Sequence, residues 1–356
     1  MITITKPVIT ELESSIRYSF NVVESDTKNI YIDVDKTFKD FVSDFSDAAL
    51  IAVLAPAMVE QKNIHIQGKV SKSLFDNLSE LQDLIIKVIP WVYKVDIVAT
   101  NIVESKNYKK DTVITGFSGG VDAFTTLHDY YLNPTYNKKI THLLFNNLIY
   151  NEKIADDKFN FLANLANELK LPIIKTSTNF HKIYEKKKIG FEQTHPIRNA
   201  VIAHLLSANG ITFLYSSSFP LKDFEIKPWP DIAIVNKVLL PLLSTDKVNI
   251  LDVGSEYNRV DKMKIIANIP YTYDFLDICI GKKHLKSDYY NCSQCYKCMR
   301  ALVTFEKLGV LNNYNKLFDI NLYKTEKDKY LRKVRRSTQL NDVDLVKFLN
   351  GEQHDT

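Results

Sequence analysis

The sequence predicts an α/β protein with a doubly wound parallel sheet, a small α+β domain before it and a cysteine-rich subdomain towards the C-terminal end. Three observations support this fold class. From residue 111 onward, short apolar runs alternate with segments of helical spacing. A glycine-rich turn joins the first apolar run to the first helical segment. All the cysteines of the 356-residue chain fall between residues 279 and 298.

Residues 1–105 are predicted to form the small α+β domain, and the sequence suggests no definite role for it. In chain order, the expected elements are strands at 18–22 and 30–34, a helix over 38–60, a strand at 64–66, a helix over 72–88 and a closing strand over 91–99. Proline lacks the N–H group that a helix interior needs, so Pro56 is expected to end or bend the first helix.

A polar stretch over 104–111 marks the expected boundary of the second domain, which we assign to residues 111–311. The expected strands are 112–115, 140–145, 172–176 and 211–215, and the expected helices between them are 121–131, 154–170 and 196–208. Strands that alternate with helices in this way favour a parallel sheet covered on both faces.

Composition and charge narrow the class of protein. Hydrophobic residues make up 45% of the chain, but no apolar run approaches the roughly 20 residues of a membrane helix. We therefore expect a cytoplasmic protein without a membrane partner. The net charge of +4 is too small to indicate nucleic acid by itself.

The last segment, 312–356, is expected to be a basic helical tail. Its positive charge is concentrated in seven residues: Lys324, Lys327, Lys329, Arg332, Lys333, Arg335 and Arg336. A solvated helix face is the favoured interpretation of such a run. The alternative is a contact surface for a polyanion such as tRNA or DNA.

The glycine-rich turn has the composition of a phosphate-binding loop. It runs Gly116, Phe117, Ser118, Gly119, Gly120, Val121, Asp122, Ala123. The glycines let backbone N–H groups approach an anion closely, and Ser118 adds a hydroxyl donor. Asp122 would repel phosphate unless it bonds the loop's own amides or helps to hold Mg²⁺. The alternative is a glycine turn without a ligand.

The cysteine cluster has the spacing of a metal site. Cys292, Cys295 and Cys298 form a Cys-x-x-Cys-x-x-Cys run, and twelve residues separate Cys279 from Cys292. Four thiolates suit a closed, structural, tetrahedral Zn²⁺ site. His284 is the alternative fourth ligand, and four reduced thiols without a metal remain the other interpretation.

The loop resembles the Ser-Gly-Gly-x-Asp-Ser PP-loop of the N-type ATP pyrophosphatases. The order of later motifs resembles one branch, the 7-cyano-7-deazaguanine synthases (QueC). These motifs are Pro196-Ile197-Arg198-Asn199, Pro241-Leu242, Lys262-Met263-Lys264-Ile265-Ile266, the four cysteines and Arg300. The resemblance covers residues 111–311.

This sequence departs from that pattern at several places. Ala123 replaces the last serine of the loop. Residues 144–148 and 215–220 differ from the segments that contact substrate in the family, and the family lacks an N-terminal unit like 1–105. Proteins with such extra N-terminal regions are known in bacterial antiphage defence clusters, and this chain resembles those specialised paralogues.

The resemblance implies an adenine nucleotide alpha hydrolase-like fold and an ATP-dependent ligase that uses ATP and Mg²⁺ and carries structural Zn²⁺. A small carboxylate, such as a 7-deazaguanine, would be adenylated with release of pyrophosphate, and ammonia would then displace AMP to give an amide. A second activation would dehydrate the amide to a nitrile. The alternatives are an enzyme that modifies a protein or nucleic acid, and a nucleotide sensor without turnover. A homodimer is expected by analogy.

The resemblance also implies roles for individual residues. The implied catalytic residues are Ser118, Asp122, Arg198 and Lys262. ATP would be bound by 116–123, Phe145, Arg198 and Asn199. For three residues a structural role is the alternative: Arg198 as an ion-pair partner, Lys262 as a surface lysine and His195 as a helix cap.

Overall fold

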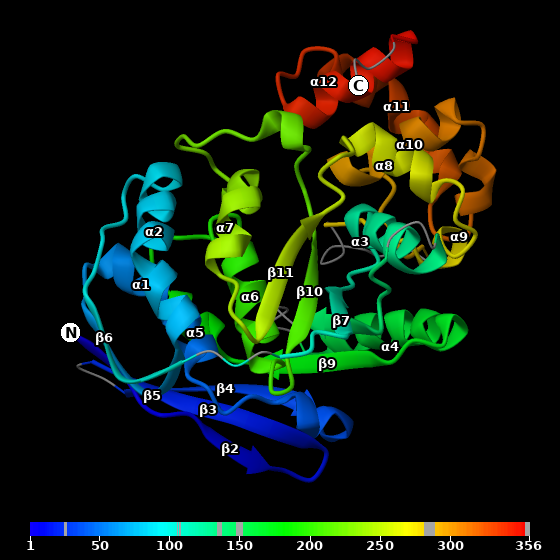
Figure 1. Cartoon of the computed structure of the whole chain (residues 1–356). Coiled ribbons are helices and arrows are strands. Elements are labelled where there is room, and N and C mark those ends of the chain that lie inside the picture. The colour runs from blue at the N-terminus through cyan, green and yellow to red at the C-terminus, as the bar shows by residue number, and fades with distance from the viewer. Residues whose placement is uncertain are drawn as a thin grey trace.

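The computed structural model describes residues 1–24, 27–104, 106, 108–133, 137–146, 152–280 and 289–352. In this part of the chain, eleven strands form one mixed sheet with the order β11-β10-β7-β8-β9-β4-β3-β1-β5-β6, and β2 pairs with β3 (Figure 1). The strands are β1 (Ile2–Ile4), β2 (Val8–Glu11), β3 (Ser15–Val23), β4 (Thr27–Asp35), β5 (Ile64–Ser71), β6 (Ile97–Val103), β7 (Thr112–Gly116), β8 (His142–Asn146), β9 (Ile173–Thr178), β10 (Ile211–Ser216) and β11 (Val248–Val253).

Helices cover both faces of this sheet. They are α1 (Asp47–Glu60), α2 (Lys72–Val88), α3 (Val121–Leu127), α4 (Glu152–Leu169), α5 (His181–Tyr184), α6 (His195–Leu205), α7 (Asn236–Leu242), α8 (Arg259–Ile266), α9 (Thr272–Phe275), α10 (Tyr296–Lys307), α11 (Ile320–Val334) and α12 (Leu340–Asn350). A π-helix, His128–Leu132, extends α3, and short 3₁₀ helices lie at Lys36–Phe41, Leu221–Asp223, Ile232–Val235 and Leu311–Tyr314. The α/β class with a large, mostly parallel sheet is thus confirmed.

The strands β11, β10, β7, β8 and β9 are all parallel, and their side chains alternate between two cores. Val113 and Leu143 belong to the core that contains side chains of α3, α4, α8 and α10. Ile114 and Leu144 belong to the opposite core, with α1, α2, α6 and α7. This alternation follows from the period of two along a strand, and it explains why apolar residues stand next to each other in these strands.

The helix predicted over 38–60 is corrected by the structure, in which a 3₁₀ helix and a loop precede α1. The Asp35 carboxylate caps the 3₁₀ helix through Thr37 N–H (2.9 Å), and the Tyr18 hydroxyl donates to the Phe45 carbonyl (2.8 Å). Both contacts favour a separate segment.

Pro56 lies inside α1 without ending it. Proline cannot donate to the carbonyl four residues earlier, which is that of Ala52. The Tyr184 hydroxyl donates to this carbonyl instead, at 3.2 Å. The closing strand is also displaced from its expected position at 91–99, because β6 occupies Ile97–Val103.

Residues 1–105, the N-terminal unit, have the expected mixture of strands and helices. Their sheet and core are continuous with those of the second domain, residues 111–311. Antiparallel pairing joins β4 to β9, with Ile32 opposite Thr178 and Val34 opposite Thr176. In α1, every residue from Asp47 to Met58 is buried. Such a helix needs apolar neighbours all round, and α6 supplies one side of them.

Within the described ranges, none of the helices is both long and apolar enough to span a membrane.

Because one core joins both units, we expect Leu54→Ala to destabilise the whole chain. Leu54 is fully buried in α1, and truncation of such a side chain costs about 2–5 kcal/mol. Denaturant unfolding, followed by far-UV circular dichroism, should show a single transition at a lower midpoint. Two transitions, of which only one shifts, would mean that the N-terminal unit unfolds independently.

Candidate functional site

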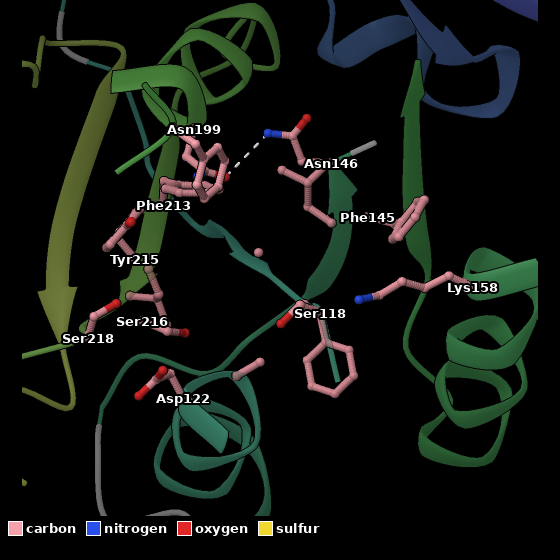
Figure 2. Close-up of a pocket in the computed structure, with 16 residues that line it drawn as sticks. Ser118, Asp122, Phe145, Asn146, Lys158, Asn199, Phe213, Tyr215, Ser216 and Ser218 are labelled. Atoms are coloured by element: carbon pink, nitrogen blue, oxygen red, sulfur yellow. Dashed lines mark hydrogen bonds between the residues drawn. The ribbon is translucent and has the colours of Figure 1, made fainter. Parts of the chain in front are cut away.

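A cavity of about 450 Å³ opens at the carboxyl ends of β7, β8 and β10. β7 lies between β8 and β10. The connection from β7 to β8 passes through α3 in one core, whereas the connection from β9 to β10 passes through α6 in the other, so the crossovers change sides of the sheet at β7. Ligands of open α/β sheets bind at such a switch point. The cavity is lined by Gly116, Phe117, Ser118, Asp122, Ala123, Leu144, Phe145, Asn146, Lys158, Phe191, Asn199, Phe213, Leu214, Tyr215, Ser216 and Ser218 (Figure 2).

The glycine-rich turn forms one wall of this cavity, and its backbone is fixed from both sides. Phe117 N–H donates to the Leu144 carbonyl (2.8 Å), and Asp277 N–H donates to the Gly119 carbonyl (2.7 Å). Gly119 has a φ of +74°, and a Cβ there would lie 3.0 Å from Leu162. A side chain at Gly119 would therefore be both strained and crowded. Ser118 is exposed, and its Oγ accepts from Gly120 N–H (3.3 Å).

Asp122 is held by two cations. Lys262 Nζ lies 2.8 Å from Asp122 Oδ1, and Arg259 Nη1 lies 3.1 Å from the same carboxylate. Lys262 also donates to the Ser217 carbonyl. The Lys262 side chain is only 2% exposed, so it is not a surface lysine.

Charge and burial act against each other in this cluster. Burial raises the pKa of Asp122, but Arg259 and Lys262 outweigh it and leave the pKa below its usual value. Burial lowers the pKa of Lys262, and Asp122 partly offsets that effect. The carboxylate thus holds two cations in place beside the cavity.

Two residues of the Pro-Ile-Arg-Asn segment face different surroundings. Asn199 lines the cavity and accepts from Asn146 Nδ2 (3.3 Å). Arg198 is outside the cavity wall, although it is buried. Its Nε donates to Thr194 Oγ1 (2.8 Å), and its guanidinium lies 3.9 Å from the centre of the Tyr184 ring. No carboxylate of the described residues forms an ion pair with it.

Of the remaining implied nucleotide contacts, Gly116, Phe117, Ser118, Ala123 and Phe145 line the cavity. Gly119, Gly120 and Val121 lie behind the wall, where Gly120 forms the N-cap of α3. The segment that follows β8 continues into 147–151, which is outside the described residues.

Several cavity residues were missed by sequence reasoning. Lys158 lies in the middle of α4, points towards Ser118 in Figure 2, and forms an ion pair with Asp277 (3.1 Å). A helical lysine carries no sequence signal for this position. Tyr215 ends the predicted strand over 211–215, and Ser216 and Ser218 follow it. Their position at the carboxyl end of the strand was the signal available.

A hydrogen-bonded chain leads away from the cavity at Tyr215. The Tyr215 hydroxyl lies 2.6 Å from His195 Nδ1, and His195 Nε2 lies 2.9 Å from Asp231 Oδ1. Burial, together with the nearby Asp231, raises the pKa of Tyr215 well above its ordinary value. His195 therefore connects β10 to Asp231 and does more than begin α6.

The four cysteines come together as a second centre. Their sulfur atoms all lie within 4.8 Å of one another. Sulfur atoms around a tetrahedral zinc ion are about 3.8 Å apart, and Cys292 and Cys298 Sγ are separated by that distance. The N–H groups of Cys292 and Cys295 point at Sγ of Cys279 and Cys292, respectively, at 3.4 and 3.2 Å.

This arrangement could hold a metal ion such as zinc, with Cys279 as the fourth ligand. The alternative ligand, His284, lies outside the described residues. The cluster is also connected to the glycine loop, because Asp277 lies two residues before Cys279 and donates to Gly119.

We expect the purified protein to contain about one equivalent of zinc, and Cys298→Ser to lose most of it, because a fourth thiolate closes the tetrahedral site. Elemental analysis by mass spectrometry measures both. Met299→Leu, a neighbouring substitution in α10 that leaves every thiol in place, serves as the control. The assignment would be contradicted if the wild-type protein contained no zinc and were as stable without added zinc as with it.

Comparisons with known proteins add little to this picture. No protein-family model and no solved structure matches the chain. An F-box protein of Arabidopsis thaliana is 26% identical over 144 residues, which are 40% of this chain and 33% of the F-box protein. The chain thus spans about a third of the length of this relative.

Proposed function

We propose that the chain is an ATP-dependent enzyme that adenylates a carboxylate and releases pyrophosphate. The observation that carries the proposal is the pair of cations fixed on Asp122 at the edge of the glycine-loop cavity, the buried Lys262 and the partly buried Arg259. Cations fixed beside backbone N–H groups neutralise the charge that moves to a leaving pyrophosphate.

The shape and lining of the cavity fit a nucleotide. Its volume of about 450 Å³ lies within the usual range for ligand pockets. Phe145, Phe213 and Tyr215 offer apolar surface for a planar base, whereas Ser118 and Lys158 offer donors for phosphate oxygens. Both carboxylate oxygens of Asp122 face cations, so coordination of Mg²⁺ by Asp122 would replace one of these ion pairs.

The chemistry would proceed in two steps. An oxygen of the substrate carboxylate attacks the α-phosphorus of ATP, the bond from this phosphorus to the bridging oxygen breaks, and pyrophosphate leaves. Ammonia then attacks the acyl carbon, loses a proton, and AMP departs with the former carboxylate oxygen. The protein's part in these steps is positioning and charge neutralisation.

Apart from Asp122 and Lys158, the polar side chains that line the cavity are neutral. They include Asn146, Asn199, Ser216 and Ser218. Amides and hydroxyls can bond the edge of a heterocycle such as a deazapurine without requiring a particular charge. The acceptor could equally be presented by a protein or nucleic acid, because the chemistry requires only a carboxylate.

A nucleotide sensor without turnover is the second candidate, and Ala123 is the observation that favours it. Ala123 lines the cavity, where the related loops carry a hydroxyl.

To test the proposal, the protein is incubated with Mg-ATP, ammonium and 7-carboxy-7-deazaguanine, and AMP, pyrophosphate and the base are followed by mass spectrometry. We expect AMP with the amide or nitrile. Lys262→Met should lower the rate by about 10²- to 10³-fold. Lys264→Met, in the same helix but on an exposed side chain, should retain it. ADP as the only nucleotide product would refute the proposal.

Substitution at position 123 separates the enzyme from the sensor. Ala123→Ser restores one hydroxyl donor at the cavity wall, and we expect it to increase the rate of AMP formation several-fold, because the donor bonds a phosphate oxygen. The same assay at saturating ATP measures it. If both forms bind ATP and neither produces AMP with any acceptor, the sensor is the better description.

A further inference from the structure

A second cavity, of about 470 Å³, lies among the C-terminal helices and is separate from the glycine-loop cavity. Its walls come from the start of α10, from α11 and from the start of α12, which Figure 1 places at the end of the molecule opposite β2 and β3. The residues that matter for its chemistry are Tyr296, Glu326, Lys329, Tyr330, Lys333 and Asp342. Nothing in the function proposed above uses them.

Polar groups beside this cavity lack partners. The Tyr330 hydroxyl and Arg300 Nε are both buried, and neither finds a hydrogen-bond partner among the described residues. The remaining donors of Arg300 include Nη2, which bonds Asp342 Oδ1 at 2.8 Å. Buried polar groups without partners are unfavourable in a folded protein. Of the two residues, Tyr330 belongs to the cavity wall and Arg300 lies behind it.

Positive charge continues from the cavity along one side of α11. Lys329, Arg332, Lys333 and Arg336 are all exposed. The first three lie on one face of α11, at spacings of three and four residues, and Arg336 lies in the turn directly after the helix. We call these four residues the basic ridge. Among these four residues, only Lys329 forms an ion pair within the described part of the chain, with Glu326 at 3.4 Å.

The acidic residues of the cavity do not cancel this charge. Glu326 faces Lys329, and Asp342 is paired with Arg300. Arg332, Lys333 and Arg336 therefore remain available for an anion.

An aromatic side chain stands beside the ridge. Tyr296 lies at the first position of α10, directly after Cys295, and is 48% exposed. Lys329 and Lys333 line the same cavity as Tyr296. An exposed ring together with cations is the combination with which proteins hold single-stranded nucleic acid, because bases stack on rings and phosphates follow the cations.

We propose that the second cavity and the basic ridge bind single-stranded nucleic acid, with one base in the cavity against Tyr296 and the adjoining phosphates along the ridge. A single strand fits better than a duplex, because a base must leave its stack to enter a recess. A free nucleotide would occupy the cavity but leave Arg332 and Arg336 unused. This inference is independent of the chemistry at the glycine loop.

The first test is fluorescence anisotropy with a labelled twelve-nucleotide single strand, as DNA and as RNA, without ATP. Lys329→Gln/Lys333→Gln should weaken binding at least 10-fold at low salt and reduce the slope of log K against log salt by about 1.4, since each phosphate contact contributes about 0.7. The matched control is Lys39→Gln/Lys87→Gln, two exposed lysines of the N-terminal unit with the same loss of charge. It should change binding much less.

The second test concerns the cavity. Tyr296→Ala should weaken binding about 10-fold without changing the salt slope, because it removes a stacking surface and no charge. Tyr296→Phe keeps the ring and should bind like wild type. Zinc content measured on both variants shows whether the neighbouring cysteine cluster is intact.

Any of four results would overturn the proposal. The first three are no binding of either strand at 50 mM salt, an equal loss of affinity in the control pair, and unchanged affinity in Tyr296→Ala. The fourth is full competition by AMP at equal concentration, which would assign the cavity to a free nucleotide. None of these results bears on AMP formation, which is measured without nucleic acid.

Discussion

The position of β7 between β8 and β10 is the constraint on which the candidate site depends. Both neighbours are parallel to β7. The connection from β7 to β8 passes over one face through α3, and the connection that enters β10 passes over the other face through α6, which keeps the space above the carboxyl end of β7 open. The glycine loop enters that space, and the hydrogen bonds of Phe117 and Gly119 to neighbouring segments hold it there. The cavity is thus a consequence of strand order.

Buried charge gives this cavity its chemical character. A lysine that is nearly fully enclosed is costly unless a carboxylate accompanies it, and Asp122 provides one for Lys262 and for Arg259 together. The cluster carries a net positive charge next to the loop. A polyphosphate, as the proposed function requires, would neutralise that surplus.

The centres of the C-terminal half are linked in a series. Asp277 connects the cysteine cluster to the glycine loop, and Tyr296 begins the helix that follows the cluster. A metal held by the four thiolates would therefore fix the position of two cavities. This arrangement gives a structural metal consequences for ligand binding at sites that it does not touch.

Sequence reasoning predicted the elements of the parallel half well, because strands buried on both faces and amphipathic helices have clear periods. In the N-terminal unit, helix α2 was also predicted with its observed limits. Sequence reasoning failed where tertiary contacts decide the structure. Pro56 lies inside α1, where a distant side chain, Tyr184, bonds the Ala52 carbonyl. The pairing of β4 with β9 leaves no local signal.

The site shows the same division. The loop and the cysteines are local patterns and could be recognised. Lys158 and Arg259 reach their places only through the fold. Arg198 was expected at the nucleotide, but its guanidinium lies over Tyr184, outside the cavity wall.

Binding of Mg-ATP, measured by isothermal titration calorimetry on wild type and Gly116→Val, tests the central claim most directly. The nearest atoms to a Cβ at Gly116 are 4.0 Å away, on Asn199 and Phe213, so a valine would fit the strand end and project into the cavity. The account predicts one-to-one binding to wild type and at least a 10-fold loss in Gly116→Val at unchanged unfolding midpoint. Equal affinity of the two proteins, or no binding to wild type, would contradict it.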